Sequence, residues 1–233
     1  MIEIAIEQLY FDKANPIASG LNACFTKGHL FYIYGRNGIG KTTLFKTLAG
    51  LHQGFKGQIT IEGITLSDFS TQERARKLAF MFQTETVYPF FKVHEYLELA
   101  NIPNDKNDSI NDEFKSYVIK GLDLEKHLDR YLKELSQGQF QKVKLATCLL
   151  QMTDYIILDE PFAHLDLVQK ERMNHFIQEL VKEKNKCVIL STHHFDLDFK
   201  NNNHTLCLTS TQLTGLTNSE NSKEKLIQLL CAD

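Results

Sequence analysis

Residues 35–43 have the sequence GRNGIGKTT, and this stretch decides the fold class. It fits the pattern GxxxxGK[ST], in which glycines let the backbone wrap closely around a phosphate group. An apolar run precedes it at residues 30–34, and apolar residues at helical spacing follow it, which predicts strand, loop and helix in that order. The N-terminus of that helix would present its positive dipole end to the same anion. We therefore predict a phosphate-binding site formed by Gly35, Asn37, Gly38, Gly40, Lys41, Thr42 and Thr43.

The chemistry expected of this loop follows from two side chains. The Lys41 ammonium would contact the β- and γ-phosphates of a nucleotide, and the Thr42 hydroxyl is a ligand for Mg²⁺. The predicted cofactors are therefore ATP and Mg²⁺. A glycine-rich turn with an exposed lysine is the alternative.

A second apolar run, residues 155–158, ends in two acids, Asp159 and Glu160. In a parallel sheet, residues that follow a strand lie at the edge where ligands bind. We expect Asp159 to hold Mg²⁺, directly or through water, and Glu160 to polarise the attacking water as a general base. Taken alone, the pair could also be solvated acids after a strand.

Strand-like and helix-like patterns alternate along the chain, which indicates a largely parallel sheet. Strands are expected at residues 2–6, 30–34, 58–61, 78–82, 155–158, 187–190 and 206–208. Helices are expected at residues 42–51, 139–151, 167–184 and 224–230, and a loop at 209–222. Polar helical segments between residues 93 and 132 predict a helical subdomain, residues 84–132, inserted in a single domain of residues 1–233.

Composition excludes several classes of function. The formal net charge of −3 gives no basic face, so nucleic acid is not an expected partner. The five cysteines are odd in number and form no CxxC pair, which argues against a disulfide framework or a metal site. No apolar run approaches the roughly 18 residues that span a bilayer, and no signal peptide is recognisable. Work at a membrane would therefore need an anchoring partner.

Residues 135–139 have the sequence LSQGQ and open a predicted helix. This element is similar to the LSGGQ signature of the ABC ATPase superfamily, and the resemblance runs over roughly residues 2–208. It implies an α/β fold, that of a P-loop NTPase with a mainly parallel central sheet, an N-terminal antiparallel β part and a helical insertion. In such proteins the signature binds the γ-phosphate of ATP held by a second copy, a role that falls here on Ser136 and Gly138. Gln137 stands where glycine is usual, and a helix N-cap formed by Ser136 is the structural alternative.

The same resemblance implies three further site residues. Gln83 would reach Mg²⁺ and the lytic water, Asp166 would cross the dimer interface, and His193 would hydrogen-bond the γ-phosphate. A metal site formed by His193 and His194 is the rival interpretation, but no other ligand lies at a matching spacing. The aromatic residue that usually stacks on adenine is replaced by Lys13. Tyr10 or Phe11 could substitute, although core packing is the default expectation for both.

Residues 71–83 and 161–167 look like the ATPases of iron-siderophore, haem and vitamin B12 (cobalamin) importers. This implies an ATP-hydrolysing subunit that powers import and docks, through residues 84–132, on membrane-embedded permease subunits at the cytoplasmic face of the cell membrane. An ATPase of a haem exporter for cytochrome c maturation is an alternative, favoured by the missing adenine aromatic. A soluble iron–sulfur cluster assembly ATPase is another.

Overall fold

The computed structural model describes residues 1–12, 16–83, 88–101, 112–193, 204–216 and 222–232. Its first sheet is antiparallel and, in spatial order, consists of β2 (Pro16–Phe25), β1 (Ile2–Tyr10), β4 (Phe55–Ile61) and β5 (Ile64–Thr65). Along β1 every second side chain near the start is buried, so that Ile2, Ile4 and Ile6 face the interior. The expected antiparallel N-terminal part is thereby confirmed.

The second sheet carries the predicted parallel arrangement. Its strands, in spatial order, are β10 (Leu213–Leu216), β9 (His204–Leu208), β3 (Leu30–Tyr34), β8 (Cys187–Ser191), β7 (Tyr155–Leu158) and β6 (Leu78–Met81). Five of them run parallel, and β10 pairs antiparallel with β9. All residues of β3, β7 and β8 are buried, because both faces of the sheet are covered.

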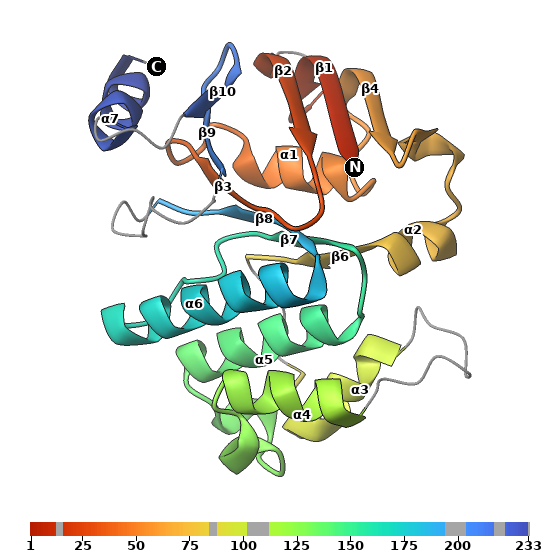
Figure 1. Ribbon diagram of the computed structural model, residues 1–233, viewed down its shortest axis with the longest axis vertical. Coiled ribbons are helices and arrows are strands. Elements are labelled where there is room, and N and C mark those ends of the chain that lie inside the picture. Colours follow the sequence, from red (N-terminus) through yellow and green to blue (C-terminus); the bar gives the residue numbers. More distant parts are fainter. Residues whose placement is uncertain (13–15, 84–87, 102–111, 194–203, 217–221, 233) are drawn as a thin grey trace.

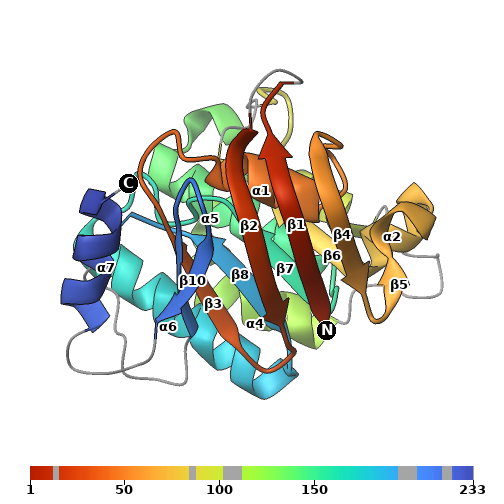
Figure 2. The same cartoon turned by 90° about the horizontal axis from the view of Figure 1, so that it is seen from above.

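The elements stack in layers (Figures 1 and 2). Helix α1 (Lys41–Leu48) lies between the two sheets, where Leu44, Phe45 and Leu48 are fully buried. On the other face of the parallel sheet lie α5 (Gln137–Leu150) and α6 (Leu167–Lys184), and beyond them α3 (Val93–Glu98) and α4 (Asp112–Gly121). Helix α2 (Thr71–Lys77) precedes β6, and α7 (Ser222–Ala232) packs against β9 and β10. Short 3₁₀ segments are Leu66–Asp68, Leu99–Asn101, Glu125–His127 and Leu132–Glu134.

Several expectations from the sequence need correction. The segment 209–222 was expected to be loop, but it contains β10. Helix α1 ends at Leu48, because Gly50 follows in a left-handed conformation with φ +68°. Helix α5 begins two residues earlier than expected, because Ser136 caps it. Strand β2, with its mixed polar and apolar sequence, and helix α2 were not predicted at all.

The helical region beyond the parallel sheet contains α3 and α4 as expected, although the proposed boundary at residue 84 lies outside the described residues. None of the helices among the described residues has the length and apolar character needed to cross a membrane.

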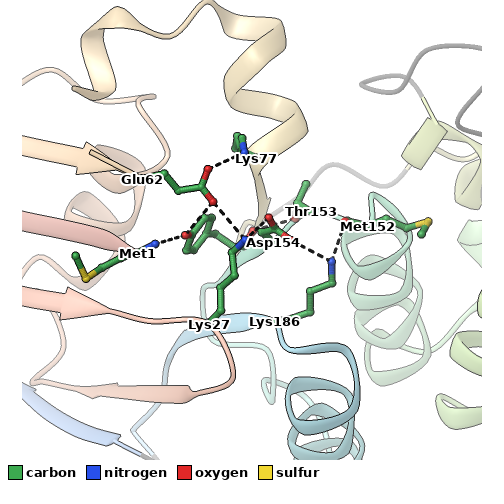
Figure 3. Close-up of polar contacts among 9 residues, drawn as sticks. Met1, Lys27, Glu62, Lys77, Met152, Thr153, Asp154 and Lys186 are labelled. Carbon is green, nitrogen blue, oxygen red and sulfur yellow. Dashed lines mark hydrogen bonds and ion pairs between the residues drawn. The ribbon is translucent and has the colours of Figure 1, made fainter. Parts of the chain in front are cut away.

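A cluster of charged side chains joins the two sheets at the edge where β3, β7 and β8 begin (Figure 3). The Lys27 ammonium lies 2.5 Å from Asp154 Oδ2 and 3.3 Å from Glu62 Oε1. Lys77 contacts Glu62 Oε2 at 2.7 Å, and Lys186 lies 3.6 Å from Asp154 Oδ1. The hydrogen bond from Lys77, with that from Lys27, holds the pKa of Glu62 below its usual value. The antiparallel sheet is thus tied to the base of the parallel sheet, opposite the edge described next.

Candidate active site

The carboxyl ends of β3, β6, β7 and β8 meet around one cavity of about 440 Å³. Its walls are formed mainly by residues that follow these strands and by the start of α1, together with Phe11 after β1 and Ile17 of β2. The sequence-predicted residues that line it are Asn37, Gly38, Gly40, Lys41, Thr42, Thr43, Gln83, Asp159, Glu160 and His193. The fold therefore brings most of the candidate residues together, as parallel strands do at their carboxyl edge.

The glycine-rich loop is shaped for close approach of an anion. Gly38 and Gly40 have φ angles of +83° and +106°, in the region that glycine alone adopts without strain. Lys41 is only 7% exposed, and its ammonium donates to the carbonyls of Gly35 at 2.7 Å and Arg36 at 3.2 Å. Burial lowers the pKa of Lys41, while the nearby carboxylates of the acid pair partly restore it. A cation is thus held inside the loop.

Gly35 does not line this cavity. A Cβ atom at Gly35 would lie 2.9 Å from Ile39 Cγ2 and 3.1 Å from the Leu208 carbonyl oxygen. Gly35 therefore serves the packing of the loop against β9, and its carbonyl is the acceptor for Lys41.

Two oxygen-bearing side chains of the cavity are in direct contact. The Thr42 hydroxyl donates to Asp159 Oδ2 at 2.7 Å, and the Ser191 hydroxyl donates to Asp159 Oδ1 at 2.7 Å. A hydroxyl and a carboxylate beside a phosphate loop are the hard oxygen donors that Mg²⁺ prefers, so these residues fit that ion. Among the residues that the structure describes, no group of three or more His, Cys, Asp or Glu side chains is arranged for a metal ion. His194, named in the rival metal interpretation, lies outside the described residues.

The backbone of Glu160 is fixed by hydrogen bonds at both its N–H and its carbonyl. It has a left-handed backbone, with φ +51°, which is a strained conformation for a residue other than glycine. Its N–H donates to the Ser191 hydroxyl at 2.8 Å, and the buried Gln141 side chain donates to its carbonyl at 2.9 Å and to that of Pro161 at 3.1 Å. The Glu160 carboxylate lies 2.9 Å from Nδ1 of His193. These contacts aim one carboxylate oxygen at the histidine.

The signature segment lies outside the cavity. Ser136 caps α5 by accepting from the Gln139 N–H at 3.2 Å, as the N-cap alternative predicts. A Cβ atom at Gly138 would lie 2.9 Å from the His164 carbonyl oxygen, so only glycine fits there. Gln137 has an ordinary helical backbone, so the glycine that is usual at this position is not required.

Asp166 also lies away from the cavity lining. It is the N-cap of α6, where its carboxylate accepts from the Gln169 N–H at 2.8 Å. With Ser136 and Gly138 it belongs to the group of candidate residues that the fold of a single chain does not bring to the phosphate loop.

The sequence offered Phe11 as a possible substitute for the adenine aromatic, with core packing as the default. Phe11 is 74% exposed and lines the cavity, so the expectation that it packs in the core is wrong. Ile17, which was not predicted, also lines the cavity and lies against Gly40. Tyr10 is half-buried and its hydroxyl donates to Gln8 at 2.5 Å. Lys13 lies outside the described residues.

Ser191 and Gln141 were not predicted, because the groups that they contact are distant in sequence. Gln141 donates to backbone carbonyls, and Ser191 contacts a backbone N–H and a carboxylate. The position of Ser191 at the end of a buried strand, two residues before His193, was the one signal in the sequence.

Comparisons with known proteins find relatives of this chain. The family model described as ABC transporter matches residues 18–163, more than half of the chain. The iron(3+)-hydroxamate import ATP-binding protein FhuC of Bacillus subtilis is 28% identical over 200 residues, which cover 83% of this chain and 74% of FhuC. The thiamine import ATP-binding protein ThiQ of Aliivibrio fischeri is 35% identical over 172 residues, covering 72% of this chain and 70% of ThiQ.

Among solved structures, a dimeric bacterial ABC transporter cassette superposes with a TM-score of 0.79 and 23% identity, covering 91% of this chain and 96% of that one. This likeness concerns the fold. The family match, the 35% identical relative and the phosphate loop with its acid pair together show that the chain belongs to the ABC transporter family, as an ATP-binding and ATP-hydrolysing subunit.

Proposed function

We propose specific roles for the residues around the cavity. Lys41 and the N–H groups of its loop would bind the β- and γ-phosphates, and Thr42, Asp159 and the amide oxygen of Gln83 would hold Mg²⁺. When bound, Mg²⁺ would neutralise the charge that develops on the phosphates. Glu160 accepts the proton of the attacking water, since its carboxylate faces the cavity on a backbone fixed from both sides.

His193 completes this arrangement. Its Nδ1 contact at 2.9 Å orients the Glu160 carboxylate, and the ring lines the same cavity as the phosphate loop. We assign to it a hydrogen bond to the γ-phosphate. Phe11 and Ile17 supply apolar surface at the same cavity, which supports a base-stacking role for Phe11 in place of residue 13.

The active form is a homodimer in which each ATP lies between two chains. The observation that carries this proposal is that Ser136, Gly138 and Asp166 lie outside the cavity that contains the other candidate residues. The start of α5 presents N–H groups of the kind that bind phosphate, and it can meet a nucleotide held by another copy. ATP would then join the chains, and loss of the γ-phosphate would release them.

The test uses Glu160→Gln, which keeps the size of the side chain but is a far poorer base. Size-exclusion chromatography should show a dimer with ATP and a monomer with ADP. The matched control combines Glu160→Gln with Lys41→Ala, which should stay monomeric under both conditions because the phosphate contact is lost. The shared site would be contradicted if Glu160→Gln stays monomeric with ATP and if two copies bound to the permease also fail to associate with ATP.

The helical subdomain, residues 84–132 of the single domain 1–233, is the proposed docking region for permease subunits. Three aromatic side chains near its start and end are exposed, namely Tyr88, Phe90 and Tyr131, with Phe90 84% exposed. Exposed aromatic surface of this kind is common where proteins associate. The partner is membrane-embedded, which would hold this chain at the cytoplasmic face of the cell membrane. Nucleic acid is not proposed as a partner, because the net charge is −3.

The transported substrate is proposed to be an iron chelate, haem or a cobalamin-like compound. Residues 71–83 and 161–167 and the relationship to FhuC support this, whereas the relationship to ThiQ supports thiamine. Affinity purification of the tagged chain from native membranes should recover a polytopic permease. Recovery of soluble scaffold proteins alone would favour iron–sulfur cluster assembly.

ATPase assays on the recovered complex then distinguish among the candidate substrates. In proteoliposomes with the cognate binding protein, ferric hydroxamate, haem or cobalamin should stimulate ATP hydrolysis, and thiamine should not. Stimulation by thiamine alone would refute the proposed substrate class, while leaving the assignment as a transport ATPase intact.

A further inference from the structure

Helix α5 carries a buried lysine that none of the roles above uses. Lys144 is only 5% exposed, which is uncommon for a lysine side chain. Its ammonium donates to the carbonyl oxygens of Phe82 at 3.0 Å and Gln83 at 3.2 Å. It also lies 5.8 Å from the centre of the Phe140 ring, one turn earlier on the same helix. The charge is therefore directed at the segment that follows β6.

These two carbonyls define the backbone of one residue. The Phe82 carbonyl belongs to the peptide plane before the Cα atom of Gln83, and the Gln83 carbonyl belongs to the plane after it. Holding both planes fixes φ and ψ of Gln83, and so fixes the direction in which its side chain leaves the backbone. Gln83 lines the cavity with Lys41 and Asp159.

We propose that Lys144 is a positioning residue for Gln83, acting through these charge-assisted hydrogen bonds across the cavity wall. The proposal rests on the proposed role of Gln83 at Mg²⁺ and the lytic water. Lys144 stands on the helix that begins beside Ser136, so one rigid element contacts both the backbone at Gln83 and the segment proposed to meet the partner's nucleotide. A displacement of α5 would therefore be transmitted to Gln83.

The first test replaces Lys144 with methionine, which keeps the apolar stem and removes the ammonium. The matched control is Lys142→Met, which removes the same charge from the same helix, where Lys142 pairs with Asp123 at 3.3 Å. ATP turnover of Lys144→Met should fall about tenfold or more, because small misplacements of a site group are costly. The affinity for a fluorescent ATP analogue should change less than about twofold, since the phosphate loop is untouched, and Lys142→Met should resemble the parent in both assays.

The second test is a double-mutant cycle with Gln83→Ala, measured by single-turnover hydrolysis. If Lys144 acts through Gln83, adding Lys144→Met to Gln83→Ala should lower turnover less than about twofold further. A full and additive loss in that background would show that Lys144 merely supports the fold, and would overturn the proposal, as would parent-like turnover of Lys144→Met. If the methionine variant fails to fold, Lys144→Gln takes its place in the same cycle.

Different results would count against the proposed cavity roles and against the role of Lys144. A parent chain and a Lys142→Met control that hydrolyse no ATP would count against the proposed roles in the cavity. An active parent with an additive cycle would count against Lys144 alone.

Discussion

Replacing Ser191 with alanine should destabilise the protein and slow hydrolysis through a single hydroxyl group. Ser191 is 0% exposed, and its hydroxyl donates to Asp159 Oδ1 at 2.7 Å while accepting from the Glu160 N–H at 2.8 Å. The one oxygen thus links the proposed magnesium ligand to the proposed general base. Alanine leaves a buried carboxylate oxygen and a buried N–H without these partners.

The expected loss in free energy of unfolding follows from the two hydrogen bonds of the Ser191 hydroxyl. A hydrogen bond to a charged group contributes about 1.5–3 kcal/mol and a neutral one about 0.5–1.5 kcal/mol, so the loss in free energy of unfolding should be about 2–4.5 kcal/mol. Turnover should fall about tenfold or more, because Glu160 holds a left-handed backbone that this bond supports. Nucleotide affinity should change little, since the two hydrogen bonds of the Ser191 hydroxyl go to Asp159 and Glu160 and not to Lys41.

The assay is urea unfolding followed by far-ultraviolet circular dichroism, because the chain has no tryptophan. Thr153→Val is the matched control: its buried hydroxyl donates to the Tyr155 carbonyl at 2.9 Å, away from the cavity, so its loss should cost about 1 kcal/mol with no effect on turnover. The reasoning is refuted if Ser191→Ala costs no more stability than Thr153→Val and leaves turnover unchanged.

Three other perturbations have defined outcomes. Phe11→Ala removes the exposed aromatic ring at the cavity, so the KM for ATP should rise about fivefold or more with kcat unchanged, and an unchanged KM in steady-state assays would exclude Phe11 as the base contact. Gly121→Ala would place a Cβ atom 2.1 Å from the buried ring of Phe176, so the free energy of unfolding should fall by about 1–3 kcal/mol in urea titrations, and a gain in stability would contradict this packing. Hydrogen bonds from lysines hold the pKa of Glu62 below its usual value. Partial burial would raise the pKa of Asp154, but its lysine contacts outweigh that effect and lower it. The two carboxylates therefore stabilise the fold at neutral pH, and this contribution is lost as the pH falls below about 4. The loss should be small and reduced by salt because both side chains are about one third exposed, and an E62Q/D154N variant with the same acid sensitivity as the parent would rule out this source.

The buried elements could be predicted from the sequence because their patterns are set by burial alone. The runs at residues 30–34, 155–158 and 187–190 are uniformly apolar, and each is a fully buried strand. The boundaries of α6 match the expectation, Leu167–Lys184, because Asp166 caps its start and Asn185 ends it in a left-handed conformation. The phosphate loop was recognisable for a similar reason, since its glycines have conformations that other residues rarely adopt.

What could not be predicted depends on partners distant in the chain. Strand β2 contains Gly20 and Asn22, which are poor strand formers, and it is a strand because β1 pairs with it over its length. Strand β10 exists because it pairs with β9 across a turn at residues 209–212. In the site, Ser191 and Lys144 act on backbone groups and a carboxylate that only the folded chain brings near, so their residue types alone carry no signal.

The contact between Gly138 and the His164 carbonyl bears on how related chains are found in sequence collections. At position 137 the backbone is an ordinary right-handed helix, which residues of every common type adopt, and glutamine stands there without strain. At position 138 any side chain would collide with a carbonyl oxygen. A search pattern that demands glycine at both positions rejects this chain for a residue the fold does not require. A pattern that leaves the first position open and fixes the second would retain it, and with it other cassettes that a stricter definition of the motif overlooks.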